Sequence, residues 1–350
     1  MSLRIQEPRV PKTIDAAAPE GGLAPAPVSP TSGSGIRGFL QSRGSSSFAD
    51  STFRWLMLLS ALSIFAIVGL IFVELVSHSQ ITLARFGYKF FVGSAWDPVN
   101  DNFGALPFIY GTIVSSVVSL VIAVPLAVGV AVFLTEMCPK AMRGILSFLT
   151  ELLAAIPSVV YGLWGIFVLV PLLRGYIDPV LIALLGWTGL FVRPDFGIGL
   201  FAAGVILAIM ILPIISSLTR EVMNAVPHTQ REAVLALGAT RWEMIRMGVL
   251  RNARIGIVGS IILGLGRALG ETMAVAMVIG SSPTITKSLL APAATMASVI
   301  ANEFAEAADD TYRSALIEIG LALFIVTIIV NILARLLVWA VTRGAPARAN

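Results

Sequence analysis

Two oppositely charged side chains, Arg267 and Glu271, stand four residues apart in a strongly apolar part of the sequence. A charged residue at the centre of a membrane helix costs about 2.5–3.5 kcal/mol to insert, so such residues are functional candidates by default. The arginine guanidinium offers a planar fork of N–H donors that suits a tetrahedral oxyanion. The carboxylate can accept an O–H from an oxyanion that still carries a proton, as phosphate does near neutral pH and sulfate does not.

The same predicted helix carries small and polar residues on the face that holds these charges. The residues of this face follow one another at intervals of 4, 4, 3, 4 and 3, which places them within about 80° of the helix circumference. They are Gly256, Ser260, Gly264, Arg267, Glu271 and Ala274. We expect Arg267 and Glu271, with Ser260 and Gly264, to line a path for a charged solute. The alternative is a self-contained ion pair that holds two helices together.

The composition argues against most soluble classes of protein. Hydrophobic residues make up 57% of the 350 residues and charged residues 13%, whereas a soluble globular chain carries about 25% charged residues. A soluble enzyme, a nucleic-acid-binding protein and a disordered chain are therefore excluded, and the long apolar runs exclude a transmembrane β-barrel. The single cysteine, Cys138, and the two histidines, His78 and His228, offer neither a disulfide nor a metal cluster. We expect an all-α, polytopic transmembrane helical bundle without metal or cofactor.

Six apolar runs are long enough to cross a bilayer, since a span needs about 20 mostly apolar residues. A shorter run, 180–191, contains two glycines and predicts a re-entrant or interfacial piece. Residues 1–50, rich in Pro, Ala, Gly and Ser, predict a flexible tail. After this tail we expect a transmembrane domain over 51–343 and a short C-terminal tail over 344–350. The predicted spans are 55–76, 108–134, 146–173, 197–218, 257–280 and 315–341.

The positive charges predict the orientation of the chain. Six spans place both termini on one side of the membrane, and sixteen of the 24 lysines and arginines lie on that side against six on the other. Cytoplasmic loops of membrane proteins carry the excess of Lys and Arg, so we expect both termini in the cytoplasm. The two remaining basic residues, Arg267 and Arg335, lie within predicted spans.

The loop between the fourth and fifth predicted spans carries a second group of candidate residues. Thr229 with Glu232, and Thr240 with Glu243, each match the spacing of a capping box at the start of a helix. Gly238 between them suits a helix end. The pattern predicts two short helices joined at a glycine corner, which can dock into a groove on a cytoplasmic partner. The alternatives are a plain connecting hairpin and a DNA-binding helix–turn–helix.

The arrangement Glu232-Ala233-Val234-x3-Gly238 resembles the EAA motif of permease subunits of bacterial ATP-binding-cassette importers. In that family the corresponding loop, here about 220–256, seats in a cleft of the ATPase subunit. The resemblance implies that Glu232, Ala233, Gly238 and Arg241 belong to this coupling loop.

Three further strings are similar to the PstC family of phosphate-importer permeases, and the similarity covers about residues 51–343. In that family the Arg and Glu of the last string are associated with phosphate passage, and they correspond to Arg267 and Glu271. The strings are FGALPFIYGT at 103–112, IPSVVYGLWG at 156–165 and GLGRALGETMAV at 264–275.

The resemblance implies a type I (MetI-like) ABC importer permease of a bacterial inner membrane. It implies a heteromeric assembly with a second permease (PstA-like), ATPase subunits (PstB-like) and an extracytoplasmic phosphate-binding protein (PstS-like), which moves phosphate by alternating access and binds no nucleic acid. The sequence has no Walker loop, G-x4-G-K-[ST], so ATP hydrolysis is expected on a separate subunit. Two alternatives stay open: a permease for another oxyanion, and an ion-coupled secondary transporter acting alone.

Overall fold

The computed structural model describes residues 46–193 and 196–342. The predicted tails therefore lie outside the described residues, apart from 46–50, which already belong to helix α2 (Ser46–His78). The chain divides into two units, Met1–Phe65 and Ala66–Asn350. Of the first unit the structure describes the beginning of α2, whose large apolar side chains are exposed, as lipid-facing side chains are.

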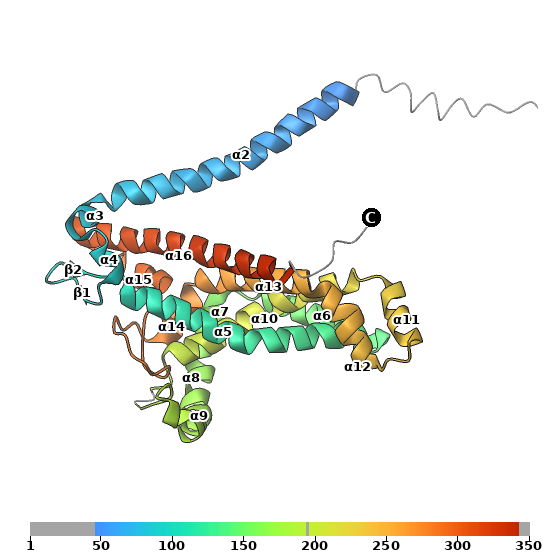
Figure 1. Cartoon of the computed structure of the whole chain (residues 1–350). Coiled ribbons are helices and arrows are strands. Elements are labelled where there is room, and N and C mark those ends of the chain that lie inside the picture. The colour runs from blue at the N-terminus through green and yellow to red at the C-terminus, as the bar shows by residue number, and fades with distance from the viewer. Residues whose placement is uncertain (1–45, 194–195, 343–350) are drawn as a thin grey trace, which may run out of the picture. The chain divides into compact units, whose positions relative to one another are not determined.

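Within the described residues, six helical segments are long and apolar enough to cross a membrane, which confirms the predicted number of spans. Figure 1 shows most of them as long helices of the second unit. The segments are Asp50–His78, Leu106–Met137, Ser158–Thr188, Leu200–Asn224, Arg241–Leu269 and Asp310–Trp339.

The predicted third span, 146–173, is wrong. Its first half belongs to α6 (Lys140–Ala155), an amphipathic helix with no buried residue, and the observed span begins only after Pro157. Proline has no N–H to donate and disfavours helix in the residue before it, so one apolar run is cut into two helices. The span then continues to Thr188 through α7 (Ser158–Trp164), η2 (Gly165–Leu169), α8 (Val170–Leu172), η3 (Leu173–Ile177), α9 (Asp178–Leu185) and η4 (Gly186–Thr188).

The segment 180–191, predicted as a re-entrant or interfacial piece, is helical for most of its length. Residues up to Thr188 continue the helical segment that begins at Ser158. Only Gly189 and the residues after it leave the helix. Gly189 adopts a left-handed conformation, with φ of 75°, which a glycine takes at little cost.

The predicted fifth span, 257–280, is displaced in the structure. The span begins at Arg241, runs through α12 (Arg241–Glu243), η5 (Met244–Leu250) and α13 (Arg251–Leu269), and ends at Leu269. Glycine is a poor helix former, and the helix stops at Gly270. After a short link, α14 (Met273–Ile279) begins and packs against α7.

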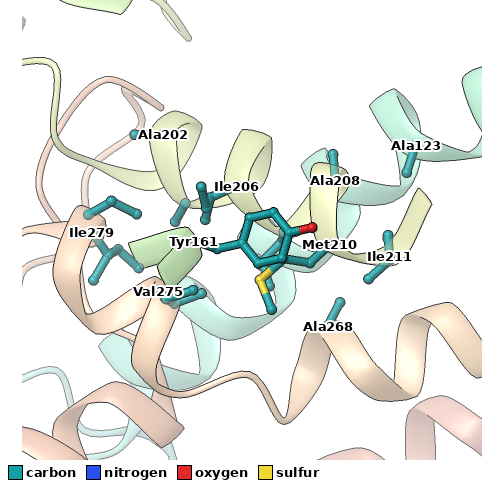
Figure 2. Close-up of a cluster of buried hydrophobic side chains, with 14 of the residues drawn as sticks. Ala123, Tyr161, Ala202, Ile206, Ala208, Met210, Ile211, Ala268, Val275 and Ile279 are labelled. Atoms are coloured by element: carbon teal, nitrogen blue, oxygen red, sulfur yellow. The ribbon is translucent and has the colours of Figure 1, made fainter. Parts of the chain in front are cut away.

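The helix α10 (Leu200–Asn224) is the centre of the bundle, with 67% of its most apolar window buried. It packs between α5 (Leu106–Val132) and α13. Figure 2 shows the apolar cluster around it, to which Tyr161 of α7 and Met210 of α10 both belong. The Tyr161 hydroxyl donates a hydrogen bond of 2.7 Å to the carbonyl of Leu153, so its polar end is satisfied.

A second apolar cluster lies where the predicted outer loops meet the spans. Phe103, Phe108, Trp96 and Tyr312 form a connected set of ring contacts. Glu303 accepts hydrogen bonds from Trp96 Nε1 at 2.9 Å and from the Tyr312 hydroxyl at 2.6 Å. The cluster joins α3 (Gln80–Phe86), α4 (Lys89–Val92), β1 (Trp96–Asp97), β2 (Asn102–Phe103), α15 (Met296–Glu303) and α16 (Asp310–Thr342).

The strands β1 and β2 form a small antiparallel hairpin, in which Trp96 pairs with Phe103 and Asp97 with Asn102. The turn is held by Asp97, which accepts hydrogen bonds from the Asn100 side chain at 2.7 Å and from the backbone N–H groups of Val99 and Asn100. These donors, the Asn100 side chain first, hold the pKa of Asp97 below its ordinary value, because they stabilise the carboxylate.

The contact of α13 with α10 makes Gly264 intolerant of a larger side chain. A Cβ atom at Gly264 would lie 2.7 Å from Cδ1 of Ile215, whereas a Cβ at Gly259 on the same helix meets nothing within 4 Å. Overpacking of this kind costs about 1–3 kcal/mol. We therefore predict that Gly264→Leu lowers the thermal unfolding temperature of the detergent-purified chain and that Gly259→Leu does not. Equal temperatures for the two variants would contradict this packing.

Candidate functional site

Arg267, near the end of the fifth span, and Glu271, just beyond it, form a loose ion contact. Arg267 Nη2 lies 3.9 Å from Glu271 Oε2, beyond hydrogen-bonding distance. The Arg267 side chain is 47% exposed and that of Glu271 only 7%. The Glu271 Oε1 atom accepts a hydrogen bond of 3.4 Å from the backbone N–H of Ala274. Among the described residues the guanidinium donates no hydrogen bond to protein, so its donors are open to an anion.

The sequence predicts one continuous helix for the two charges, but in the structure they do not lie on the same helix. Arg267 is in the last turn of α13, whereas Glu271 lies in the link between α13 and α14. Thr272, the next residue of the link, donates its hydroxyl to the Gly270 carbonyl. The predicted single face from Gly256 to Ala274 is therefore interrupted at Gly270.

The structure places Ser260 and Gly264 against α10. The Ser260 hydroxyl is buried, lies 2.9 Å from the Thr219 hydroxyl and donates to the Ile257 carbonyl. Gly264 packs on Ile215. In this chain the two residues thus have packing partners on the neighbouring helix, whereas Arg267, one turn further, has an exposed side chain.

Another face of α13 is uncovered in this chain. Gly259 and Gly266 have open space where a Cβ would point, and Leu263 between them is exposed. Small residues on a membrane helix allow a second helix to approach closely. The uncovered face therefore has the form of a helix-packing surface, and Arg267 lies at its edge.

The predicted helix–glycine–helix element is present on the loop that follows α10. It consists of α11 (His228–Ala236), a corner at Gly238 and α12. Gly238 has φ of 82°, in the left-handed region that favours glycine, and nothing lies within 4 Å of a Cβ there. The corner therefore depends on backbone conformation alone.

Of the two predicted capping boxes, the second is confirmed and the first is wrong. The Thr240 hydroxyl accepts from the Glu243 N–H at 3.3 Å, and Glu243 Oε2 accepts from the Thr240 N–H at 2.8 Å. The helix α11 instead begins after Pro227, without a side-chain cap. Proline sets φ near the helical value for its own residue, so the helix starts earlier and Thr229 lies inside its first turn.

The predicted coupling residues are all accessible in the structure. Glu232, Ala233, Gly238 and Arg241 are exposed. Large apolar side chains are also exposed there, among them Leu237 at 89% and Trp242. Beside them lies a pocket of about 600 Å³, which is lined by Glu136, Met137, Leu235, Arg241, Trp242, Met244 and Ile245.

A buried ion pair on the inner side of this loop was not found from the sequence. Arg231 Nη2 lies 3.0 Å from Glu136 Oε1, and both side chains are nearly inaccessible. In the sequence, Arg231 is only one of the positive charges expected in the cytoplasm. A weak signal existed, because Glu136 is an acidic residue directly after a long apolar run. In residues 46–193 and 196–342 no group of three or more potential metal ligands comes together.

A bundle of six candidate spans, with an Arg–Glu pair at the end of the fifth and an exposed helix–glycine–helix element before it, defines the class of protein as a membrane permease. Residues 123–343 match the family described as "Binding-protein-dependent transport system inner membrane component". The chain belongs to this family, and it is a multi-pass inner-membrane component of a transport system.

Curated relatives cover most of the chain. A "Phosphate transport system permease protein PstC" of Mesorhizobium japonicum is 43% identical over 290 residues, which is 82% of this chain and 89% of the relative. A protein of the same name from Haemophilus influenzae is 46% identical over 293 residues, 83% of this chain and 93% of the relative. These similarities confirm the resemblance that the three sequence strings had indicated.

Solved structures confirm the fold of an importer permease. A bacterial ABC transporter "involved in the import of the acidic polysaccharide alginate" has a chain that aligns with a TM-score of 0.56, over 85% of this chain and 99% of that one. A second structure of an alginate ABC transporter aligns with a TM-score of 0.54. Sequence identity is 16% and 17%, so the likeness concerns the fold.

The capping difference between the two short helices is testable. Loss of an N-cap side chain costs about 1 kcal/mol, which corresponds to a several-fold increase in local opening. We predict that Thr240→Ala speeds amide hydrogen exchange at the start of α12 and that Thr229→Ala leaves exchange in α11 unchanged. Faster exchange in α11 for the Thr229 variant would contradict the observed helix start at His228.

Proposed function

We propose that this chain is a permease subunit of an ATP-driven phosphate importer. The observation that carries the proposal is identity of 43–46% to permeases named for phosphate transport, over more than four-fifths of the chain.

The chemistry of Arg267 and Glu271 supports a solute that is an anion and still carries a proton. The guanidinium has open donors and an exposed side chain, so it can meet an oxyanion in a bidentate manner. The carboxylate of Glu271 repels a fully ionised oxyanion but accepts an O–H from monohydrogen phosphate or dihydrogen phosphate. We infer that Arg267 and Glu271 contact the solute. We do not extend this role to Ser260 and Gly264, because both pack on α10.

The exposed helix–glycine–helix element supports a cytoplasmic ATPase as partner. Its apolar side chains Leu237 and Trp242 are exposed, and Glu232, Ala233, Gly238 and Arg241 are exposed as well. An apolar patch on a rigid, capped element is suited to a groove on another protein. ATP hydrolysis is then supplied by that partner, a PstB-like subunit. The orientation that follows places both termini in the cytoplasm, in agreement with the positive charges.

Two further partners complete the proposed assembly. The uncovered face of α13 with Gly259, Leu263 and Gly266 suits close packing of a helix from a second, PstA-like permease. Arg267 at the edge of this face would then lie near the boundary between the two permeases. The family description, binding-protein-dependent transport, implies an extracytoplasmic solute-binding protein, here PstS-like.

Removal of either charge tests the solute and the site together. A hydrogen bond to a charged group contributes about 1.5–3 kcal/mol, so we predict that Arg267→Gln lowers labelled phosphate uptake by the reconstituted complex at least about tenfold. Glu271→Gln is expected to lower uptake and to weaken discrimination against sulfate.

The matched control is Arg335→Gln, which removes another arginine from a span, one with an exposed side chain. It is expected to leave uptake unchanged. Sulfate or molybdate could inhibit wild-type uptake as strongly as unlabelled phosphate does. That result would favour a permease for another oxyanion. Uptake by the purified chain without ATP would favour a secondary transporter.

The docking proposal predicts that Leu237→Glu prevents capture of the ATPase subunit. A charge introduced into an apolar contact must be desolvated on binding, which costs several kilocalories per mole when it is unpaired. The matched control is Val99→Glu, since Val99 is 91% exposed and lies in the β1–β2 hairpin, far along the sequence from the loop. Pull-down of the ATPase with each variant distinguishes them, and equal capture would refute docking through Leu237.

A further inference from the structure

The buried side chain of Arg231 uses its whole guanidinium to bind three acceptors in two separate parts of the chain. Its Nε and Nη2 atoms donate to Glu136 Oε1 at 3.2 and 3.0 Å. Its Nη1 donates to the Val226 carbonyl at 2.6 Å, and Nη2 also donates to the Met223 carbonyl at 2.9 Å. Arg231 thus satisfies a buried carboxylate and two backbone carbonyls at once, which the planar fork of an arginine makes possible.

These three acceptors belong to the ends of two membrane spans. Glu136 lies in η1 (Phe133–Met137), the π-helical end of the span that begins with α5. Met223 is in the last turn of α10, and Val226 follows that helix. The last carbonyls of a helix have no partner within the helix and carry the negative end of its dipole, so a cation is favourable there. Arg231 therefore ties the exposed helix α11 to α5 and α10.

Apolar packing supports the same connection. Val234, one turn after Arg231 in α11, packs with Met223, Met244 and Ile245 in a buried cluster. Its Cγ2 atom lies 3.4 Å from the position of a Cβ at Gly248 in η5. One face of α11 is thus held to three spans, while Glu232, Ala233 and Leu237 on its outer side remain free for a partner.

The two spans that Arg231 binds are connected by helix packing to the helix that carries Arg267. The helices α5 and α10 pack along each other, and α10 packs along α13, whose last turn carries Arg267. A displacement of α11 that is passed to α10 therefore reaches the helix that carries Arg267. A buried ion pair is weak evidence for stability, because desolvation of the two charges offsets their attraction. Its directional hydrogen bonds instead fix one geometry between the elements that it joins.

We propose that Arg231 is a positioning residue that transmits movement of the docking helix α11 to α5 and α10, through Glu136 and the carbonyls of Val226 and Met223. The inference rests on the proposed function, since it assumes that an ATPase moves α11. Without this linkage, ATP hydrolysis is no longer coupled to transport. The ATPase still docks on the exposed side of α11, but movement of α11 no longer moves the spans.

The test uses the whole complex in proteoliposomes, with Arg231→Lys in place of a charge deletion. Lysine keeps the positive charge beside Glu136 but has no fork with which to hold the carboxylate and both carbonyls together. We expect ATP hydrolysis to change by no more than about twofold, while the number of phosphate ions imported per ATP falls about tenfold, within the range of coupling free energies. A poorly folded variant lowers both rates together and leaves this ratio unchanged.

The matched control is Arg220→Lys. Arg220 donates a 2.7 Å hydrogen bond to Glu151, which joins α10 to α6 rather than to α11, and Glu151 is 57% exposed. Its ratio of ions imported to ATP hydrolysed is expected to match that of the wild type. An unchanged ratio for Arg231→Lys, or an equal fall for Arg220→Lys, overturns the proposal.

Hydrogen exchange supplies a readout that does not depend on the solute. In the wild-type complex, trapping with ATP and vanadate is expected to alter exchange in α11, η1 and the last turn of α10 together. In Arg231→Lys the change is expected in α11 alone, and joint changes in the variant overturn the proposal. If wild-type proteoliposomes import another oxyanion but no phosphate, the proposed substrate fails, and the ratio measured with that oxyanion still tests Arg231.

Discussion

The close approach of α10 and α13 is the constraint from which the arrangement of the second unit follows. Gly256, Ser260 and Gly264 lie along one side of α13 and face larger residues of α10. In a bilayer the surrounding lipid is as apolar as the side chains, so helices associate through close packing and hydrogen bonds rather than through a hydrophobic driving force. The contact fixes the rotation of α13 about its axis, and with it the direction in which Arg267 leaves the helix.

The number of spans, the glycine corner and the second capping box could all be predicted from the sequence, because each depends on local composition or on spacings of a few residues. The third span could not be placed correctly. An apolar run from 146 to 173 looks like one span, and hydropathy does not record that Pro157 divides it into a surface helix and the true start. The single face predicted from Gly256 to Ala274 is too long for a related reason, since a helical projection assumes that the helix continues through Gly270.

The loop that carries α11 shows a different limit of sequence reasoning. Arg231 and Glu136 are 95 residues apart in the chain, and no periodicity relates them. Their pairing appears only when α11 folds back on the ends of two spans. A count of positive charges predicts a side of the membrane for such an arginine, but it treats every arginine alike. The buried Arg231 and the exposed Arg241 differ in burial and partners, although they contribute equally to that count.

The interruption of the helix after Leu269 affects the distance between Arg267 and Glu271. In a continuous helix, the Cα atoms of residues four apart keep a nearly constant distance, because a backbone hydrogen bond joins residue i to residue i−4. Here the peptide groups at Gly270 and Thr272 lie outside both helices, so α13 and α14 meet at a joint. A small change in the angle at this joint alters the distance between guanidinium and carboxylate without unwinding either helix. The gap between opposite charges is thereby adjustable, and α7, which packs on α14, is placed to adjust it.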